Sequence, residues 1–141
     1  MARKVDDIET YIGLPYTKRG RSREEGFDCW GLMIDLIKRV HDYDFPDPEY
    51  DLKSEKEIAD AILEYDKSEL ANQVKIENIQ YGDIVMISNF TLKTAYHFGM
   101  YIGDGRVIHG MGFGTEVLPL KRLKPYITGV YRPKPTTKST S

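Results

Sequence analysis

The chain has 141 residues, of which 40% are apolar and 30% charged, and its net charge is −2 at pH 7. A chain of this length can bury a core without disulfides or metals, and its dispersed Lys and Arg residues exclude the basic stripe that nucleic-acid binding requires. The N-terminus has no apolar signal segment, and no stretch approaches the ~18 apolar residues of a membrane span. We therefore expect cytoplasmic synthesis without a signal peptide, no membrane insertion and no nucleic-acid partner.

The N-terminal half predicts two amphipathic helices. Residues 4–12 form a short helix whose apolar side carries Val5, Ile8, Tyr11 and Ile12. Residues 29–41 repeat apolar side chains at helical spacing, with Asp28 as the N-cap and the prolines that follow as the stop. Cys29 therefore falls in the first turn of a helix that has a buried face.

An acidic, aromatic and proline-rich segment, residues 42–53, separates this helix from the next. We expect a solvated loop there. The alternative is a wall or lid over a cleft, which would select substrates by charge and through Phe45 and Tyr50. Residues 54–70 predict a further helix with a charged outer face, which begins at a possible capping box.

From residue 76 onward the pattern changes to strands. Five are predicted, at residues 83–88, 97–102, 106–110, 115–118 and 129–132. Short strands at close spacing favour an antiparallel sheet or a partly open barrel. Because helices precede strands, the predicted class is α+β. We expect one domain over residues 1–132 and a flexible tail over residues 133–141.

Cys29 is the only cysteine, so it has no intramolecular disulfide partner, and one thiol is too few for a cysteine-based structural zinc site. At a helix N-terminus, unpaired N–H groups and the helix dipole favour a thiolate. The same N–H groups can hold the oxyanion of a tetrahedral intermediate. The alternative is that Cys29 is a small buried apolar side chain.

Three histidines are available as partners for this thiol. His41 follows the predicted helix at its C-terminal end, where a cation is favoured, and we interpret it as structural. His97 and His109 lie in predicted strands joined by a short turn, so the register of this hairpin decides whether they share a face.

Two registers are compatible with the hairpin. A two-residue loop at 104–105 pairs position 100 with 109 and separates the histidines onto opposite faces. A three-residue loop at 103–105 pairs Gly99 with His109 and makes the histidines diagonal neighbours, ~7–8 Å apart at the backbone. We predict the second register, with Gly105 left-handed. His109 would then hold the ring of His97, like the third group of a catalytic triad, whereas the alternative is two unrelated strand histidines.

The segments FDCWGL and HFGMYIGDGRVIHG resemble the NlpC/P60 family of papain-like cysteine peptidases, and LPYTKRG upstream resembles the family's Pro-Tyr-x-x-Gly segment. The resemblance covers about residues 8–132. It implies a papain-like fold in which N-terminal helices, one with the nucleophile at its start, pack on an antiparallel sheet of about five to six strands. It also implies Cys29 as nucleophile, His97 as base, His109 as the orienting group and Tyr16 as a catalytic hydroxyl, with no cofactor or metal.

The usual chemistry of the family is hydrolysis of amide bonds in peptidoglycan stem peptides, commonly after γ-D-glutamate. In many members Ser follows the nucleophile and binds the free N-terminus of the stem peptide together with the preceding Asp. Here the Asp is kept as Asp28, but Trp30 stands in place of the Ser. Trp30 is therefore either a substrate-binding or a core residue, and the exact substrate is left open. The DCWGL variant also resembles phage and prophage tail-assembly proteins, which implies other tail proteins as partners and a place in the virion tail.

Three other functions are compatible with the sequence. An acyltransferase on the same fold would use the same Cys29 and His97, although the circularly permuted branch places its His before its Cys. A catalytically idle tail-assembly protein would keep the fold without the reaction. A Cys/His/His zinc site would require Cys29, His97 and His109 to converge on one ion.

Overall fold

The computed structural model describes residues 4–17, 19–42, 44–45, 71–91, 94–111 and 114–134. The predicted helix at 54–70, Tyr50 and most of the 42–53 segment lie outside these residues, as do residues 135–141. The division into one domain over residues 1–132 and a tail stays a prediction. None of the helices in the described ranges has the length and apolar character needed to span a membrane.

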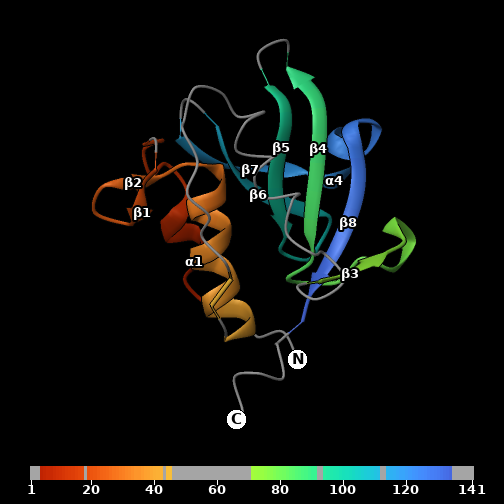
Figure 1. Ribbon diagram of the computed structural model, residues 1–141, viewed down its shortest axis with the longest axis horizontal. Coiled ribbons are helices and arrows are strands. Elements are labelled where there is room, and N and C mark those ends of the chain that lie inside the picture. The colour runs from red at the N-terminus through yellow and green to blue at the C-terminus, as the bar shows by residue number, and fades with distance from the viewer. Residues whose placement is uncertain are drawn as a thin grey trace.

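The fold is α+β, with one long helix packed on an antiparallel sheet (Figure 1). The N-terminal elements are η1 (Ile8–Tyr11), β1 (Arg21–Ser22), β2 (Gly26–Phe27) and α1 (Cys29–His41). They are followed by β3 (Ala71–Val74), η2 (Ile76–Asn78), β4 (Ile84–Thr91), β5 (Thr94–Tyr101), β6 (Arg106–Met111), β7 (Gly114–Pro119), α4 (Leu120–Leu123), η3 (Lys124–Tyr126) and β8 (Ile127–Pro133).

The main sheet has six strands in the order β3-β8-β4-β5-β6-β7, and all neighbours are antiparallel. The five predicted strands correspond to β4, β5, β6, β7 and β8, and the predicted number of five to six strands is confirmed. Sequence reasoning missed β3, whose ANQV sequence shows no apolar alternation, and the two-residue strands β1 and β2.

Helix α1 has the predicted bounds because both of its ends are set by local interactions. The Asp28 carboxylate accepts a 2.7 Å hydrogen bond from the Gly31 N–H, which confirms the predicted N-cap. At the other end, Asp42 adopts a left-handed conformation with φ of 61° and donates its N–H to the Lys38 carbonyl. Cys29 is therefore fixed as the first helical residue.

The prediction of a helix over residues 4–12 is wrong in extent. Only the 3₁₀ helix η1 forms, with Val5, Ile8 and Tyr11 buried, whereas Ile12 is 51% exposed. The chain turns away at Gly13, whose φ is +88° and whose N–H donates to the Thr115 carbonyl on β7. Pairing with a distant strand thus overrides the local helical pattern.

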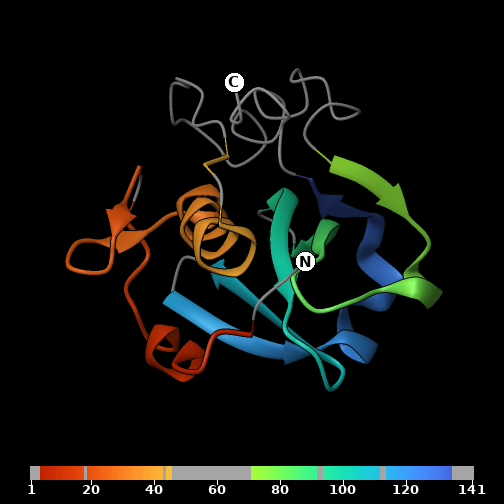
Figure 2. The ribbon, with the colours of Figure 1, turned by 90° about the horizontal axis from the view of Figure 1, so that it is seen from below.

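The two faces of the sheet bury separate apolar clusters. On one face α1 packs against β5 and β6, with Phe98, Met100 and Ile108 in this cluster. The other face buries a second cluster, made of Val85, Ile87, Val107, Leu123 and Val130. Figures 1 and 2 show α1 and α4 on opposite sides of β5. This two-sided arrangement determines which face each strand side chain can reach.

Candidate active site

The β5–β6 hairpin has the predicted three-residue register. Gly99 pairs with His109, and the loop runs over Gly103, Asp104 and Gly105, all with positive φ. It is closed by the Ile102 N–H, which donates to the Arg106 carbonyl at 2.9 Å. His97 and His109 therefore lie on the same face of the hairpin.

The two imidazoles are in direct contact. His97 Nε2 lies 2.8 Å from His109 Nδ1, a hydrogen bond in which one nitrogen donates and the other accepts. Both side chains are buried. Gly99 leaves the space they need, because a Cβ at this position would approach Val107 Cγ1 to 2.7 Å and His109 Cβ to 3.3 Å. The hairpin thus holds the ring of His97 through one of its two nitrogens.

Burial keeps this histidine pair uncharged near neutral pH. Desolvation lowers the pKa of His97, and the neighbouring His109 lowers it further. Desolvation also lowers the pKa of His109. Each neutral ring carries one N–H and one lone pair, so the chemistry of His97 depends on which nitrogen holds the proton.

Glu116 on β7 lies next to His109 of this pair, and sequence reasoning did not identify Glu116. Its Oε1 lies 3.4 Å from His109 Nε2, and the two residues are directly paired across β6 and β7. Burial raises the pKa of Glu116, an effect opposed by the charge of Arg122. The register is set by the short β6–β7 turn, where Met111 pairs with Gly114, so the turn length was the signal that could have placed Glu116 opposite His109.

Cys29 lies at the start of α1 and is 1% exposed. Its neighbour Trp30 packs edge-on against Phe98, the residue after His97, with 5.4 Å between ring centroids. His97 itself pairs with Ile87 of the second apolar cluster, so its side chain lies on the sheet face opposite that of Phe98. Among the described residues, His97 Nδ1 has no hydrogen-bond partner. The structure therefore brings His97 and His109 together but does not hydrogen-bond the thiol to His97.

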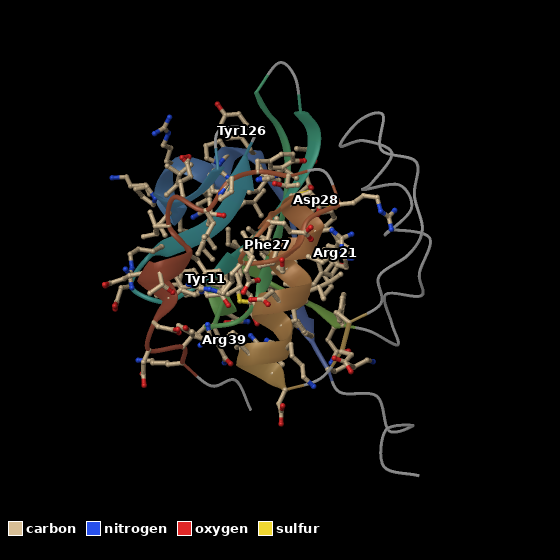
Figure 3. The ribbon with its side chains drawn as sticks, turned by 90° about the vertical axis from the view of Figure 1, so that its left-hand side faces the viewer. Tyr11, Arg21, Phe27, Asp28, Arg39 and Tyr126 are labelled. Atoms are coloured by element: carbon tan, nitrogen blue, oxygen red, sulfur yellow. The ribbon has the colours of Figure 1, made fainter. Side chains whose placement is uncertain are left out.

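The predicted substrate-binding residue Asp28 is fully buried in a polar network. One carboxylate oxygen accepts from the Gly31 N–H and from Arg21 Nη1, at 2.7 and 2.9 Å, and the other accepts from the Arg19 N–H at 3.1 Å. Figure 3 shows Asp28 and Arg21 near the N-terminal end of α1, with Tyr11 and Arg39 further along the helix. In this structure Asp28 positions the nucleophile helix, and a contact with substrate stays a prediction.

Close backbone packing explains the glycine of the DCWGL segment. A Cβ on Gly31 would meet the Gly20 carbonyl oxygen at 2.1 Å and Arg21 Nη1 at 2.8 Å. The segment that carries Arg21 therefore packs directly against the first turn of α1, and a larger residue at position 31 would displace it.

Trp30 and Tyr16 differ in burial, because Trp30 lies in the core whereas Tyr16 is half-buried. Trp30 is 3% exposed and packs between Phe45 and Phe98, which is the core position that its helical location allowed. Tyr16 is half-buried and forms a backbone bridge to Phe27, two residues before Cys29. Tyr16 thus lies near the nucleophile along the chain, and the catalytic role of its hydroxyl stays a prediction.

His41 is structural, but for a different reason from the one expected. Its Nε2 lies 2.9 Å from the Gly82 carbonyl oxygen, and desolvation lowers its pKa. A half-buried ring with a lowered pKa, rather than a cation at the helix end, thus connects α1 to the turn before β4. In the ranges that the structure describes, no three His, Cys, Asp or Glu residues are grouped so as to hold a metal ion.

A cysteine at a helix start, together with a buried histidine pair on neighbouring strands of an antiparallel sheet, defines a class of small α+β domain with a potential thiol nucleophile. Residues 13–131 match the model of the NlpC/P60 family, and the chain belongs to this family. The resemblance in the sequence motifs is thereby confirmed.

Two curated relatives and one solved structure show the range of similarity. The gamma-DL-glutamyl hydrolase of Bacillus subtilis (strain 168) is 34% identical over 105 residues, 74% of this chain and 22% of the relative. The murein DD-endopeptidase MepH of Escherichia coli (strain K12) is 30% identical over 113 residues, 80% of this chain and 37% of the relative. An NlpC/P60 family protein from Bacillus cereus ATCC 10987 superimposes with a TM-score of 0.62 at 26% identity, covering 90% of this chain and 38% of that protein. The chain spans less than half the length of each.

Proposed function

We propose that this domain is a cysteine peptidase or amidase that hydrolyses amide bonds in peptidoglycan stem peptides, of the γ-D-glutamyl endopeptidase type. Its relatives include a gamma-DL-glutamyl hydrolase and a murein endopeptidase, which supports this substrate class. The observation that carries the proposal is the hydrogen bonding of the two ring nitrogens of His97. Its Nε2 is anchored by His109, while its buried Nδ1 has no partner among the described side chains and is available as a base.

In the proposed reaction, the Cys29 sulfur attacks the amide carbon while His97 accepts the thiol proton. His97 then donates that proton to the leaving amine, which yields a thioester on Cys29. Water, deprotonated by His97, hydrolyses the thioester and restores the thiol. We assign stabilisation of the oxyanion to the Cys29 N–H and the Tyr16 hydroxyl. The mechanism requires contact between the Cys29 sulfur and His97 Nδ1 during the reaction, and catalytic hydrogen bonds often tighten only when substrate binds.

The test is to incubate the purified protein with peptidoglycan fragments, beside Cys29→Ala and the chemically related Cys29→Ser. Mass spectrometry of the products should show a cleaved stem-peptide amide with the wild type, and a rate reduced at least roughly a thousandfold in both variants. Circular dichroism would establish that the variants are folded. Equal cleavage by wild type and Cys29→Ala would overturn the proposal.

Alkylation by iodoacetamide separates two kinds of failure. Rapid labelling of Cys29 near pH 7 without cleavage would show an activated thiol with another substrate, whereas no labelling would favour the catalytically idle protein. Addition of amine or alcohol nucleophiles tests the acyltransferase alternative, because an acyltransferase would form the amide or ester product in preference to the hydrolysis product.

Fragments with free and blocked N-termini test the substrate-binding roles of Asp28 and Trp30. The carboxylate of Asp28 is occupied by Arg21 and by N–H donors, and Trp30 lies in the core. We therefore expect cleavage of both kinds of fragment at similar rates. A preference of tenfold or more for free N-termini would assign amine recognition to this end of α1.

A phage tail setting, with other tail proteins as partners, is a second and separate proposal that rests on the DCWGL sequence. Mass spectrometry of purified virions tests it. Detection of the protein in particles would support a place in the tail, and its absence from particles that contain all other tail proteins would refute it.

A further inference from the structure

Three side chains form a continuous row across three neighbouring strands. His97 on β5 contacts His109 on β6, and His109 contacts Glu116 on β7, at 2.8 and 3.4 Å. The strand register produces this row, because Gly99 pairs with His109 and His109 pairs with Glu116. His97 and His109 are buried, whereas the side chain of Glu116 is 26% exposed. The row therefore runs from the buried base outward to a carboxylate at the edge of the sheet.

The carboxylate determines where the protons of the row are most stable. An ionised carboxylate only accepts hydrogen bonds, so it favours a proton on His109 Nε2, the nitrogen that faces it. A neutral His109 with its proton on Nε2 has a lone pair on Nδ1. It then accepts from the N–H at His97 Nε2, which leaves the lone pair of His97 on Nδ1.

The opposite arrangement makes His97 unusable as a base. If the proton of His109 were on Nδ1, it would donate to His97 Nε2, and the proton of His97 would lie on Nδ1. The nitrogen that must take the thiol proton would then already be protonated. In the structure His97 Nδ1 is buried and makes no hydrogen bond within the described residues.

We propose that Glu116 is a positioning residue that holds His109 with its proton on Nε2 and thereby keeps the lone pair of His97 on Nδ1, the nitrogen to which the proposed function assigns the thiol proton. This inference rests on the proposed function in assigning Cys29 as the nucleophile. Nothing in the sequence motifs pointed to Glu116. Its role follows from the β6–β7 register and from its 3.4 Å contact with His109.

The charged groups around the row define what a substitution changes. His97 faces His109 from β5 and Glu116 faces it from β7, while Arg122 on α4 acts electrostatically on Glu116. His109 is neutral near pH 7, and its 3.4 Å contact with Glu116 lacks hydrogen-bond geometry in this structure. The terminal torsion of a Glu side chain is broad, so a rotation can bring the carboxylate oxygen into line with an N–H on His109 Nε2. Removal of Glu116 therefore takes away both an acceptor for the His109 proton and a negative charge.

Two variants separate these effects. Glu116→Gln keeps an oxygen that accepts from His109 Nε2 but removes the charge, whereas Glu116→Ala removes both. Glu77→Ala is the control, since it removes an exposed carboxylate from η2. The first readout needs no substrate: nitrogen NMR of ¹⁵N-histidine-labelled protein reports which ring nitrogen carries the proton.

We expect His97 and His109 to be protonated on Nε2 in the wild type, in Glu116→Gln and in Glu77→Ala. In Glu116→Ala, a substantial fraction of the pair should carry its protons on Nδ1. An unchanged NMR pattern in Glu116→Ala, or protons on Nδ1 already in the wild type, would overturn the proposal.

The second readout is catalysis. We expect kcat to fall roughly tenfold to hundredfold in Glu116→Ala, with KM nearly unchanged, as found when partners that orient a functional histidine are removed. Glu116→Gln should restore kcat to within about threefold of the wild type. In both variants, the limb of the pH profile that belongs to the histidine pair should move to lower pH, because the lost negative charge had favoured the protonated pair. A Glu116→Ala variant with wild-type kcat and an unshifted pH limb would refute the positioning role.

The two readouts also separate this inference from the proposed function. If the wild type cleaves no peptidoglycan but the NMR pattern changes as expected, the substrate proposal fails and the role of Glu116 in setting the protonation of the pair stands. If the wild type cleaves and Glu116→Ala does so equally well with an unchanged NMR pattern, the proposed function stands and this inference fails.

Discussion

At the start of α1, the buried carboxylate of Asp28 caps the helix and lies beside Cys29. Asp28 caps the helix that begins at Cys29, so its carboxylate lies next to the thiol that the proposed function takes as the nucleophile. Arg21 contributes the compensating positive charge, with an N–O distance of 2.9 Å. Strand β1 thus places a positive charge at the end of α1 where the helix dipole would also favour a thiolate on Cys29.

The first prediction concerns this ion pair. Arg21→Gln should destabilise the domain by about 2–3 kcal/mol, because the buried Asp28 would keep its N–H donors but lose its counter-ion. It should also slow alkylation of Cys29 by iodoacetamide near pH 7, since the uncompensated carboxylate opposes ionisation of the thiol. Urea denaturation and the alkylation rate measure the two effects.

Arg21→Lys is the matched control, since it keeps the charge and should recover most of the alkylation rate. If Arg21→Gln had the same stability and alkylation rate as the wild type, the pair would have no influence on the nucleophile.

Individual residues were predictable where local rules apply. Asp28 as N-cap and Cys29 in the first turn followed from the helix pattern, and the shared face of His97 and His109 followed from loop length. Glu116 and Arg21 were not identified, because their partners are defined by strand pairing and by close packing of the chain against α1.

At the scale of elements, the β5–β6 hairpin carries both His97 and His109 and determines their relative position. Its three-residue loop sets the register, and Gly99 provides the space beside His109. A Cβ at position 99 would lie 2.7 Å from Val107 Cγ1 and 3.1 Å from the Ile108 carbonyl oxygen, closer than these atoms tolerate. The hairpin backbone and the imidazole pair are therefore coupled through one small residue.

The second prediction tests this coupling. Gly99→Ala should destabilise the domain by about 1–3 kcal/mol through overpacking and should reduce kcat roughly tenfold or more by displacing His109. Gly105→Ala is the control. A Cβ at position 105 would meet no atom within 4 Å, but Gly105 has a φ of +69°. Gly105→Ala should therefore lower the free energy of unfolding by about 1–2 kcal/mol while leaving kcat unchanged. Equal kcat values in the two variants would show that Gly99 affects only the stability of the hairpin and not the position of His109.

Elements with their own sequence signals, such as helix caps or apolar β-type runs, were predicted well, whereas elements that depend only on pairing with a distant segment were not. Helix α1 carries its own N-cap and C-terminal turn, so its bounds were correct. The segment 4–12 has a helical apolar pattern, but Gly13 pairs with β7 and only η1 forms. Strand β3 exists because β8 pairs with it, and nothing within its four residues indicates a strand.

At the scale of the whole molecule, the sheet separates two apolar clusters, and the histidine pair is buried on one of its faces. This burial has a consequence for stability. The pKa values of His41, His97 and His109 are lowered by desolvation in the folded state, whereas the unfolded chain has ordinary values near 6.5. Below that pH the unfolded state binds more protons than the folded state, and stability must fall.

The third prediction is the resulting pH dependence. The free energy of unfolding should be constant above about pH 7 and should decrease from pH 6.5 to 5.5, by up to about 1.4 kcal/mol for each of the buried His97 and His109 and by less for the half-buried His41. Urea denaturation at a series of pH values measures this slope. The double variant His97→Gln/His109→Gln should retain only the part due to His41. A flat profile between pH 7 and 5.5 in the wild type would contradict the neutral state of the pair.

Strand β8 is the last strand of the described sheet along the chain, yet it lies between β3 and β4. A ribosome that stops before residue 127 would release a chain with β3 lacking its partner in the described sheet and β4 exposed along one edge, and exposed edges promote aggregation. Expression of chains ended at residue 126 and at residue 134 should give aggregated and soluble products, respectively; equal solubility would contradict this. Nonsense truncation upstream of β8 would then remove the protein by aggregation rather than leave a shortened, soluble domain that still carries Cys29.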